Sequence, residues 1–102
     1  MIHVIATIEL NSGKREAFLA EFHRLMPLVR AEKGCIEYGP AVDVPTGLPM
    51  QDAPRPDTVL VIEKWADLPA LHAHLQAPHM LDYRGRVKDF VRAVRLQILQ
   101  PA

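Results

Sequence analysis

Apolar and polar residues alternate through IHVIATIEL, the segment that follows the first methionine. Every second residue from Ile2 to Leu10 is apolar, whereas His3, Thr7 and Glu9 occupy intervening positions. A period of two places these two sets on opposite faces of an extended chain. The pattern therefore predicts a strand that packs one fully apolar face against helices.

The apolar period becomes that of a helix between residues 14 and 33. The stripe consists of Phe18, Phe22, Leu25 and Val29. Spacings of three and four residues put these side chains on one helix face. Pro27 lacks the N–H that the helix ladder uses, so we expect it to kink the helix or to start its last segment.

Strand and helix signals continue along the rest of the chain. The segments CIEYGPAVDV, TVLVIEKW and AVRLQIL predict strands over residues 35–44, 58–65 and 93–99. Two short helices are expected in LPALHAHLQ and HMLDYRGRVKDFV, over residues 68–76 and 79–91. The Gly-Pro pair in the first of these strands indicates a bulge or a position at a sheet edge.

The resulting order, β-α-β-β-α-β, is that of the ferredoxin-like α+β fold, in which a four-stranded antiparallel sheet carries helices on one face. A chain of 102 residues fits one such domain, spanning residues 1–102. Residues Val59–Ile62 are continuously apolar, so both faces of that strand should be covered. We expect a second subunit on the face without helices. The proline-rich residues 45–57 would form a dimer arm or cover a pocket.

Composition narrows the classes of partner. Twelve basic and twelve acidic residues cancel, which argues against a nucleic-acid or membrane-surface binder. The N-terminal segment lacks the basic region of a signal peptide, and no run approaches the ~20 apolar residues of a membrane span. Cys35 is the only cysteine, so no intrachain disulfide can form. These features predict a cytoplasmic protein.

Candidate chemistry gathers where the third predicted strand ends and the short helices begin. Glu63 and Trp65 are two residues apart, so they point to one face of the strand. His74 lies near the end of the first short helix, and His79 starts the second. A helix N-terminus favours a neutral imidazole, which can accept the proton of a phenol-type hydroxyl. The indole would supply a flat apolar wall with one N–H donor.

Each of these residues also has a structural interpretation. Trp65 would fill the core, while His74 and His79 would make local helix contacts. The histidine spacing does not match a zinc motif, so we expect no metal site. The sequence contains no GxGxxG, GxxxxGK[ST] or GxSxG, which leaves nucleotide-cofactor and serine-hydrolase functions without support.

Taken in chain order, several segments resemble the antibiotic biosynthesis monooxygenase family. They are MIHVIATIEL, GKREAFLAEF, EKGCIEY, VIEKW and LHAHLQAPHM, which together reach across almost the whole chain. The most specific features are Gly34-Cys35 with Tyr38, Glu63-x-Trp65, and His74 followed by Pro78-His79. The proline-rich insert and the ending RLQILQP are most similar to the quinol monooxygenase members.

This resemblance implies a homodimer in which two sheets face each other as a dimeric α/β-barrel, with one pocket per subunit between sheet and helices. It also implies an oxygenase that needs no metal, flavin or haem and uses O₂ as co-substrate. The implied substrate is an electron-rich phenol, quinol or anthrone. Once deprotonated, it would give an electron to O₂, and the radical pair would recombine to place oxygen on the ring.

The resemblance also carries roles onto individual residues. His79 matches the histidine at the start of the last helix, and Trp65 matches the tryptophan that lines the pocket. We therefore predict His79 as the base for a quinol hydroxyl and Trp65 as the platform for its ring. The predicted substrate-binding residues are Tyr38, Glu63, His74 and Tyr83.

Two other functions stay open at this level. One is an isomerase or lyase of a small polar or phosphorylated metabolite, favoured if the pocket is polar and lined by arginine. Arg84, Arg86 and Lys88 would then bind the phosphate instead of forming a solvated helix surface. The other is a non-catalytic dimeric module that binds an aromatic ligand or merely dimerises, favoured if Trp65, Phe90 and Met80 fill a collapsed pocket.

The resemblance also implies that haem-degrading members carry a pocket-facing asparagine on the first strand. This chain has Ala6 and Thr7 there, so haem degradation is not expected.

Overall fold

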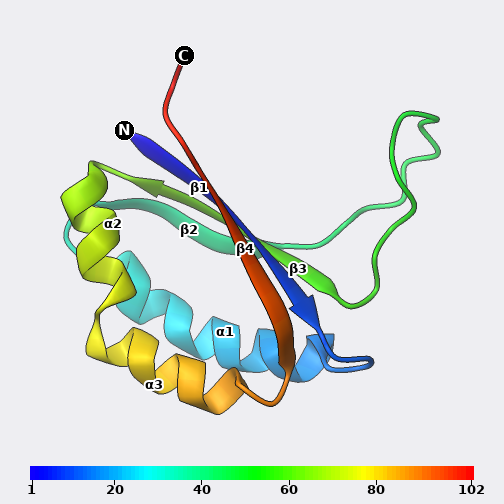
Figure 1. Ribbon diagram of the computed structural model, residues 1–102, viewed down its shortest axis with the longest axis horizontal. Helices are drawn as coiled ribbons and strands as arrows, with labels where there is room; N and C mark the ends of the chain where they lie inside the picture. The colour runs from blue at the N-terminus through cyan, green and yellow to red at the C-terminus, as the bar shows by residue number, and fades with distance from the viewer.

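The computed structural model describes all 102 residues and contains four strands and three helices (Figure 1). In chain order they are β1 (Ile2–Leu10), α1 (Arg15–Arg30), β2 (Cys35–Ala41), β3 (Thr58–Trp65), α2 (Leu68–Leu75), α3 (Pro78–Val87) and β4 (Val91–Leu99). The strands form one antiparallel sheet in the order β2-β3-β1-β4. The helices pack on one face of this sheet. The ferredoxin-like α+β fold predicted from the sequence is therefore confirmed.

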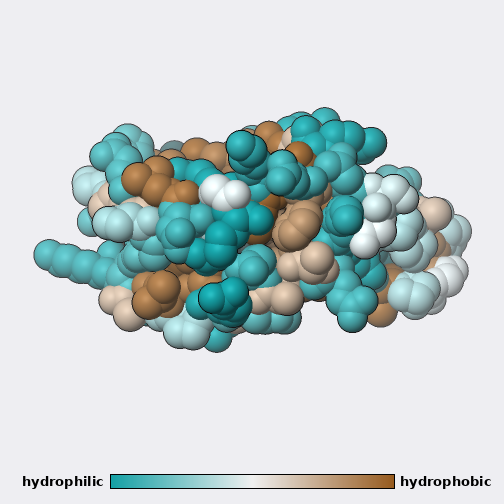
Figure 2. All heavy atoms as spheres, turned by 90° about the horizontal axis from the view of Figure 1, so that it is seen from below, coloured by the Kyte–Doolittle hydropathy of each residue, from teal (hydrophilic) through white to brown (hydrophobic).

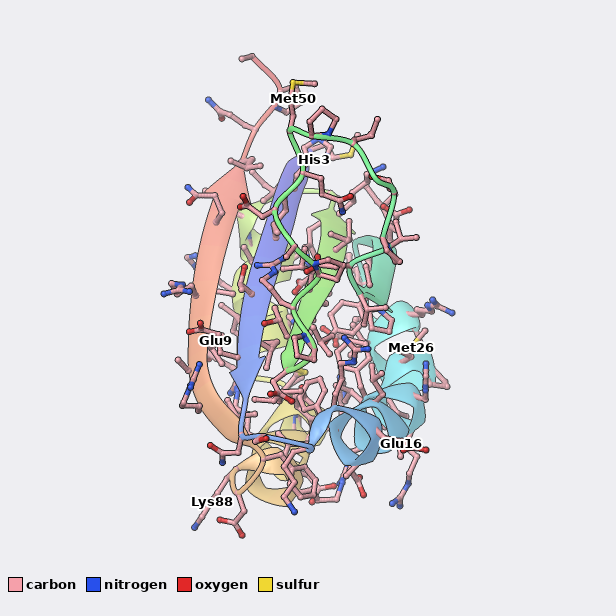
Figure 3. The ribbon with its side chains drawn as sticks, turned by 90° about the vertical axis from the view of Figure 1, so that its right-hand side faces the viewer. His3, Glu9, Glu16, Met26, Met50 and Lys88 are labelled. Carbon is pink, nitrogen blue, oxygen red and sulfur yellow. The ribbon has the colours of Figure 1, made fainter.

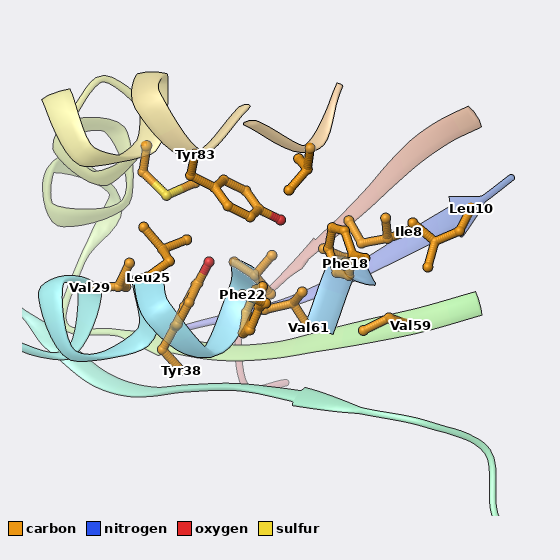
Figure 4. Close-up of a cluster of buried hydrophobic side chains, with 14 of the residues drawn as sticks. Ile8, Leu10, Phe18, Phe22, Leu25, Val29, Tyr38, Val59, Val61 and Tyr83 are labelled. Atoms are coloured by element: carbon orange, nitrogen blue, oxygen red, sulfur yellow. The ribbon is translucent and has the colours of Figure 1, made fainter. Parts of the chain in front are cut away.

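Alternation along the strands decides which side chains enter the core. On β3 the buried set is Val59, Val61, Glu63 and Trp65, as the period of two predicts. On α1 the predicted stripe is fully buried and consists of Phe18, Phe22, Leu25 and Val29. Burying each large apolar side chain stabilises the fold by roughly 1.5–3 kcal/mol. This core lies between α1, α3 and the sheet, which positions everything that follows (Figure 4).

Several element ends differ from the predicted ones. The helix α1 continues through Pro27 in its last turn, where the missing N–H removes one hydrogen bond and the Pro27 carbonyl still accepts from Ala31. The helix α3 ends at Val87, and β4 begins at Val91, because Val91 pairs with Leu10 across the sheet. The strand β2 ends at Ala41, its last residue paired with β3. As its Gly-Pro pair indicated, β2 is an edge strand.

The sheet face opposite the helices is not covered by any other element of the chain (Figure 1). On this face Ile5 is exposed, and Leu60 and Ile62 are only half-buried. The helix side differs, since its outer surface is largely hydrophilic with separate hydrophobic patches (Figure 2). Helices therefore cover one face of β3, as expected. No part of the same chain covers its other face.

Residues 42–57 form a loop that extends away from the sheet (Figure 1). Its two ends are tied together by Arg55, whose Nε donates to Oδ2 of Asp43 at 2.8 Å. This ion pair lowers the pKa of Asp43 to about 2. Figure 3 places Met50, which is 93% exposed, at the outer end of the loop. The loop is therefore an internally bonded arm with an apolar tip.

Candidate active site

A pocket of about 460 Å³ lies between α3 and the sheet. Fifteen residues line it, and eleven of them are hydrophobic. The other four are Glu63, His74, Arg84 and Lys88. This volume lies in the range of sites for small organic ligands, and a mostly apolar lining with a few polar groups is typical of them. The pocket is therefore the candidate active site, and it has not collapsed.

Of the six residues that the sequence predicted for the site, four line this pocket. They are Tyr38, Glu63, His74 and Tyr83. The remaining two, Trp65 and His79, lie next to pocket residues but do not line the pocket themselves.

Glu63 is a buried carboxyl group at the wall of the pocket. Its Oε1 accepts a hydrogen bond from Nε1 of Trp65 at 2.8 Å. Burial raises the pKa of Glu63 to about 7, although the indole hydrogen bond acts in the opposite direction. Glu63 is therefore not a solvated carboxylate, although it lies near the end of a strand. Near neutral pH the group can therefore exist in both protonation states.

Trp65 is fully buried, which differs from the expected position at the pocket wall. It is the last residue of β3, and its ring lies 4.6 Å from that of His74, centroid to centroid. The helix α2 thus covers the indole, and the only polar atom of its side chain is satisfied by Glu63. The structure gives Trp65 the role of holding Glu63 and His74 in place.

His74 combines full burial with a partner that fixes its tautomer. Its Nδ1 lies 3.0 Å from Oε2 of Glu32. A neutral imidazole in this contact donates from Nδ1, which leaves Nε2 as the acceptor. Nε2 forms no hydrogen bond within the chain, and its separation from Oε1 of Glu63 is 4.0 Å. Burial lowers the pKa of His74, and Glu32 opposes that effect, so the imidazole is neutral at neutral pH.

His79 contacts the same carboxylate from the other side. Its Nε2 lies 2.7 Å from Oε2 of Glu32, and its side chain is 24% exposed. One oxygen atom thus joins the buried His74 to a histidine at the molecular surface. Sequence analysis missed Glu32, which lies in the turn between α1 and β2. No local pattern marks it, because the two contacts span 42 and 47 residues.

Two buried tyrosines complete the polar lining. Tyr38 extends from β2 and Tyr83 from α3 into the same interior space (Figure 4). Tyr38 stacks on Phe22 with the ring centroids 5.3 Å apart, and its ring lies 5.4 Å from that of His74. Burial raises the pKa of both phenols, so both hydroxyls stay protonated and can donate to a bound ligand.

Local sequence signals position the two histidines. Oδ1 of Asp67 accepts from the backbone N–H of Ala70 at 2.9 Å and caps α2, as its residue type favours. Pro78 occupies the first turn of α3, where its missing N–H costs nothing. The chain turns between the end of α2 and the start of α3, and as a result His74 and His79 both contact Glu32.

The basic residues of α3 divide into two groups. Arg86 pairs with Glu21 at 2.8 Å and also with Asp82, on the side away from the pocket. Arg84 and Lys88 line the pocket. No group of three or more His, Cys, Asp or Glu side chains is arranged to hold a metal ion. No helix of the structure has the length and apolar character needed to cross a membrane.

Comparison with known proteins gives a consistent result. The sequence profile described as "Antibiotic biosynthesis monooxygenase" matches residues 1–86. "Probable quinol monooxygenase YgiN" of Escherichia coli (strain K12) is 41% identical over 99% of this chain and 98% of its own length. The crystal structure of PA3566 from Pseudomonas aeruginosa superposes with a TM-score of 0.80 at 27% identity, over 99% of this chain and 93% of that one.

A second solved structure, Rv0793 from Mycobacterium tuberculosis, also superposes with a TM-score of 0.80. It is 25% identical and covers 99% of this chain and 94% of that one. The resemblance noted in the sequence is therefore confirmed. Since the family profile and the 41% identity both extend over most of the chain, this protein belongs to the antibiotic biosynthesis monooxygenase family and is an enzyme of the monooxygenase class.

Proposed function

We propose that this enzyme oxidises a quinol, or a similar electron-rich phenol, with O₂ and without a metal, flavin or haem group. The observation that carries this proposal is the pocket, which combines an apolar wall with a neutral, oriented imidazole at His74. The relative in Escherichia coli, named as a probable quinol monooxygenase, supports the choice of substrate class. The absence of a prosthetic group is an expectation from the family resemblance.

In the proposed mechanism, Nε2 of His74 accepts the proton of a quinol hydroxyl. The hydrogen bond from Nδ1 to Glu32 holds the ring in the required tautomer, and the carboxylate stabilises the imidazolium that forms. This arrangement moves the base role from His79 to His74, because His74 is the histidine that lines the pocket. The hydroxyls of Tyr38 and Tyr83 would donate to the oxygen atoms of the substrate.

The quinolate then transfers one electron to O₂, which gives a semiquinone radical and superoxide. These recombine at a ring carbon to form a hydroperoxide, and the O–O bond breaks as one oxygen leaves as water. The sum is one quinol and one O₂ converted to one hydroxyquinone and one water. The proton held by the imidazole and the proton of the ring carbon supply the two hydrogens of that water.

Glu32 and His79 would stabilise the imidazolium of His74 from outside the pocket until its proton passes to the departing water. The carboxylate oxygen that contacts His74 also contacts His79, which reaches solvent. His79 would therefore act through Glu32, by holding that carboxylate in place from outside the pocket. Trp65 would act on the reaction only by positioning Glu63 and His74.

The two alternatives receive less support from the pocket. An isomerase of a phosphorylated metabolite would need a polar, arginine-lined site, whereas eleven of the fifteen lining residues are hydrophobic. A module that only dimerises would have no use for an open pocket of about 460 Å³. A non-catalytic module would have no use for the Glu32–His74 pair. An isomerase could use the same base, so the need for O₂ decides between the two enzymes.

The test is O₂ uptake by the purified, metal-stripped protein with a panel of reduced quinols. We expect uptake above autoxidation, formation of one hydroxyquinone per O₂ consumed, and loss of this activity in His74→Ala. Isomerisation or ligand binding without O₂ uptake would overturn the proposed reaction. Activity that returns only after a metal or flavin is added would overturn its independence from cofactors.

A homodimer belongs to the same proposal. The open sheet face exposes Ile5, and the arm exposes Val44, Leu48 and Met50. Exposed apolar groups on a sheet and on a neighbouring arm are typical of a surface that a second subunit covers. We expect a dimer in sedimentation analysis, weakened by Ile5→Asp and by removal of the arm.

The matched control is Leu81→Asp, because Leu81 is also an exposed apolar residue but lies on α3, away from the open face. A monomeric wild-type protein would overturn the homodimer. Equal effects of the two aspartate substitutions would overturn the choice of face.

A further inference from the structure

Two cationic side chains at the C-terminal end of α3, Arg84 in its last turn and Lys88 as its C-cap residue, border the mostly apolar pocket. They are four residues apart and therefore neighbours on one face of the helix. Neither forms an ion pair with an acidic side chain, whereas Arg86 between them has two such partners. Of the basic residues of α3, the two without acidic partners are the two at the pocket.

The two positive charges repel each other weakly, because residues four apart on a helix are neighbours and both side chains are exposed. The dipole of α3 offsets part of this repulsion, since Arg84 and Arg86 lie in its last turn. It supplies no counter-ion for the two cations that border the pocket. An anion bound between them would remove the repulsion.

The strand register indicates where these cations lie relative to the base. Glu63 is paired with Val4 of β1, and Val94 is paired with Ile8. Four residues of strand correspond to roughly 13 Å, and both Glu63 and Val94 line the pocket. Since α3 leads from the α2 side of the pocket to the start of β4, Lys88 lies at the end away from Glu63. The pocket is long enough for a fused aromatic ring with a substituent.

We propose that the substrate is a fused-ring quinol that carries a carboxylate, which Arg84 and Lys88 bind while the hydroxyl faces His74. This inference rests on the proposed function and adds the charge class of the substrate. A guanidinium can hold a carboxylate with two parallel hydrogen bonds, and the ammonium adds a second positive charge. The two cations would thereby fix which end of the ring points toward the base.

Equilibrium binding of two unreactive fluorescent ligands tests this inference without any oxygen chemistry. They are 3-hydroxy-2-naphthoate, which carries the carboxylate, and 2-naphthol, which does not. We expect the wild-type protein to bind the naphthoate about tenfold more tightly, and the preference to weaken with added salt. In the double variant Arg84→Gln/Lys88→Gln the two ligands should bind alike, with the Kd of 2-naphthol unchanged within about twofold.

The control variant is Arg92→Gln, which removes the same charge from an exposed residue of β4 outside the pocket. It should retain the full preference for the naphthoate. Equal binding of both ligands by the wild-type protein, or equal loss of preference in the control, would overturn the inference. So would a double variant that loses only its dimeric state in sedimentation, since the cations would then pair with a second subunit.

The experiments distinguish failure of the carboxylate site from failure of the proposed monooxygenase reaction. Equal binding of the two ligands together with O₂ uptake from neutral quinols would reject the carboxylate and keep the monooxygenase. Preferential binding without O₂ uptake from any quinol, carboxylated ones included, would keep the anion site and reject the reaction.

Discussion

Oε2 of Glu32 lies 3.0 Å from Nδ1 of His74, so a residue outside the pocket fixes the imidazole that lines it. The contact brings together the turn after α1 and the end of α2. An imidazole with a fixed tautomer and a second nitrogen without a hydrogen bond in the chain suits the base of the proposed mechanism. That mechanism uses both residues, although only His74 would touch the substrate.

Replacement of Glu32 by Gln should lower kcat by about 10- to 100-fold and change KM little. The amide no longer stabilises the imidazolium of His74 with a negative charge, and it holds the imidazole tautomer less strongly. The Glu32 carboxylate favours the imidazolium, so its removal should lower the pKa of His74 further. The acidic limb of the kcat–pH profile should therefore move to lower pH. Steady-state O₂ uptake across pH 5–9 measures both effects.

The matched control is Glu37→Gln, which removes the same charge from an exposed residue of β2 that pairs with Lys64. It should leave kcat and the pH profile unchanged. If Glu32→Gln behaved like this control, Glu32 would have no part in positioning the base.

Replacement of His79 by Ala should lower kcat by about tenfold and leave ligand Kd nearly unchanged, because His79 acts from outside the pocket. Replacement of His74 by Ala should cost more, about 10²- to 10⁴-fold, as expected for a general base. His72→Ala, at an exposed position of α2, is the control and should be neutral. A larger loss for His79→Ala than for His74→Ala would return the base role to His79.

Replacement of Glu63 by Gln should change how stability depends on pH. The pKa of Glu63 is raised to about 7, so the folded protein binds more protons than the unfolded chain between about pH 4.5 and pH 7. Stability from this group is therefore lost as pH rises through that window, by up to about 3 kcal/mol. Glutamine cannot ionise and still accepts from Trp65, so the variant should lack this loss.

Urea unfolding of both proteins at pH 5, 6, 7 and 8, at one protein concentration, measures the difference. The lowered pKa of His74 acts with the opposite sign below about pH 6.5, but it is present in both proteins and cancels. Parallel stability curves would mean that Glu63 is not the group whose charge opposes folding.

Local patterns were sufficient to predict the fold but not the depth of each side chain in the site. Alternation along β3 correctly placed Glu63 and Trp65 on one face, and both are buried. It did not indicate that Trp65, at the strand end, lies beneath His74, where the ring is shielded from the pocket. Periodicity fixes the direction of a side chain, whereas the helix packed above decides what that side chain meets.

Glu32 could not be predicted for a different reason. Its partners lie 42 and 47 residues away, and the three groups meet only after α2 and α3 have packed beside the end of α1. A spacing rule for helices or strands relates residues within a few positions of each other. Carboxylate–histidine contacts between separate elements therefore require the tertiary structure.

The packing that brings α2 to this site depends on Gly34, which has φ of +84°. A Cβ atom added there would lie 2.6 Å from Cβ of Ala70 on α2, closer than two carbon atoms can approach. Gly13 has a similar φ of +75°, but a Cβ atom there would meet nothing within 4 Å. Alanine should cost about 1–2 kcal/mol at either position for the left-handed backbone. At Gly34, overpacking against α2 should add about 1–3 kcal/mol.

Urea unfolding of Gly34→Ala and Gly13→Ala separates the two contributions, since Gly13→Ala carries only the backbone cost. The excess loss at Gly34 should be accompanied by reduced O₂ uptake, because a displaced α2 moves His74 away from Glu32. Equal stability losses in the two variants would mean that α2 does not depend on this close approach.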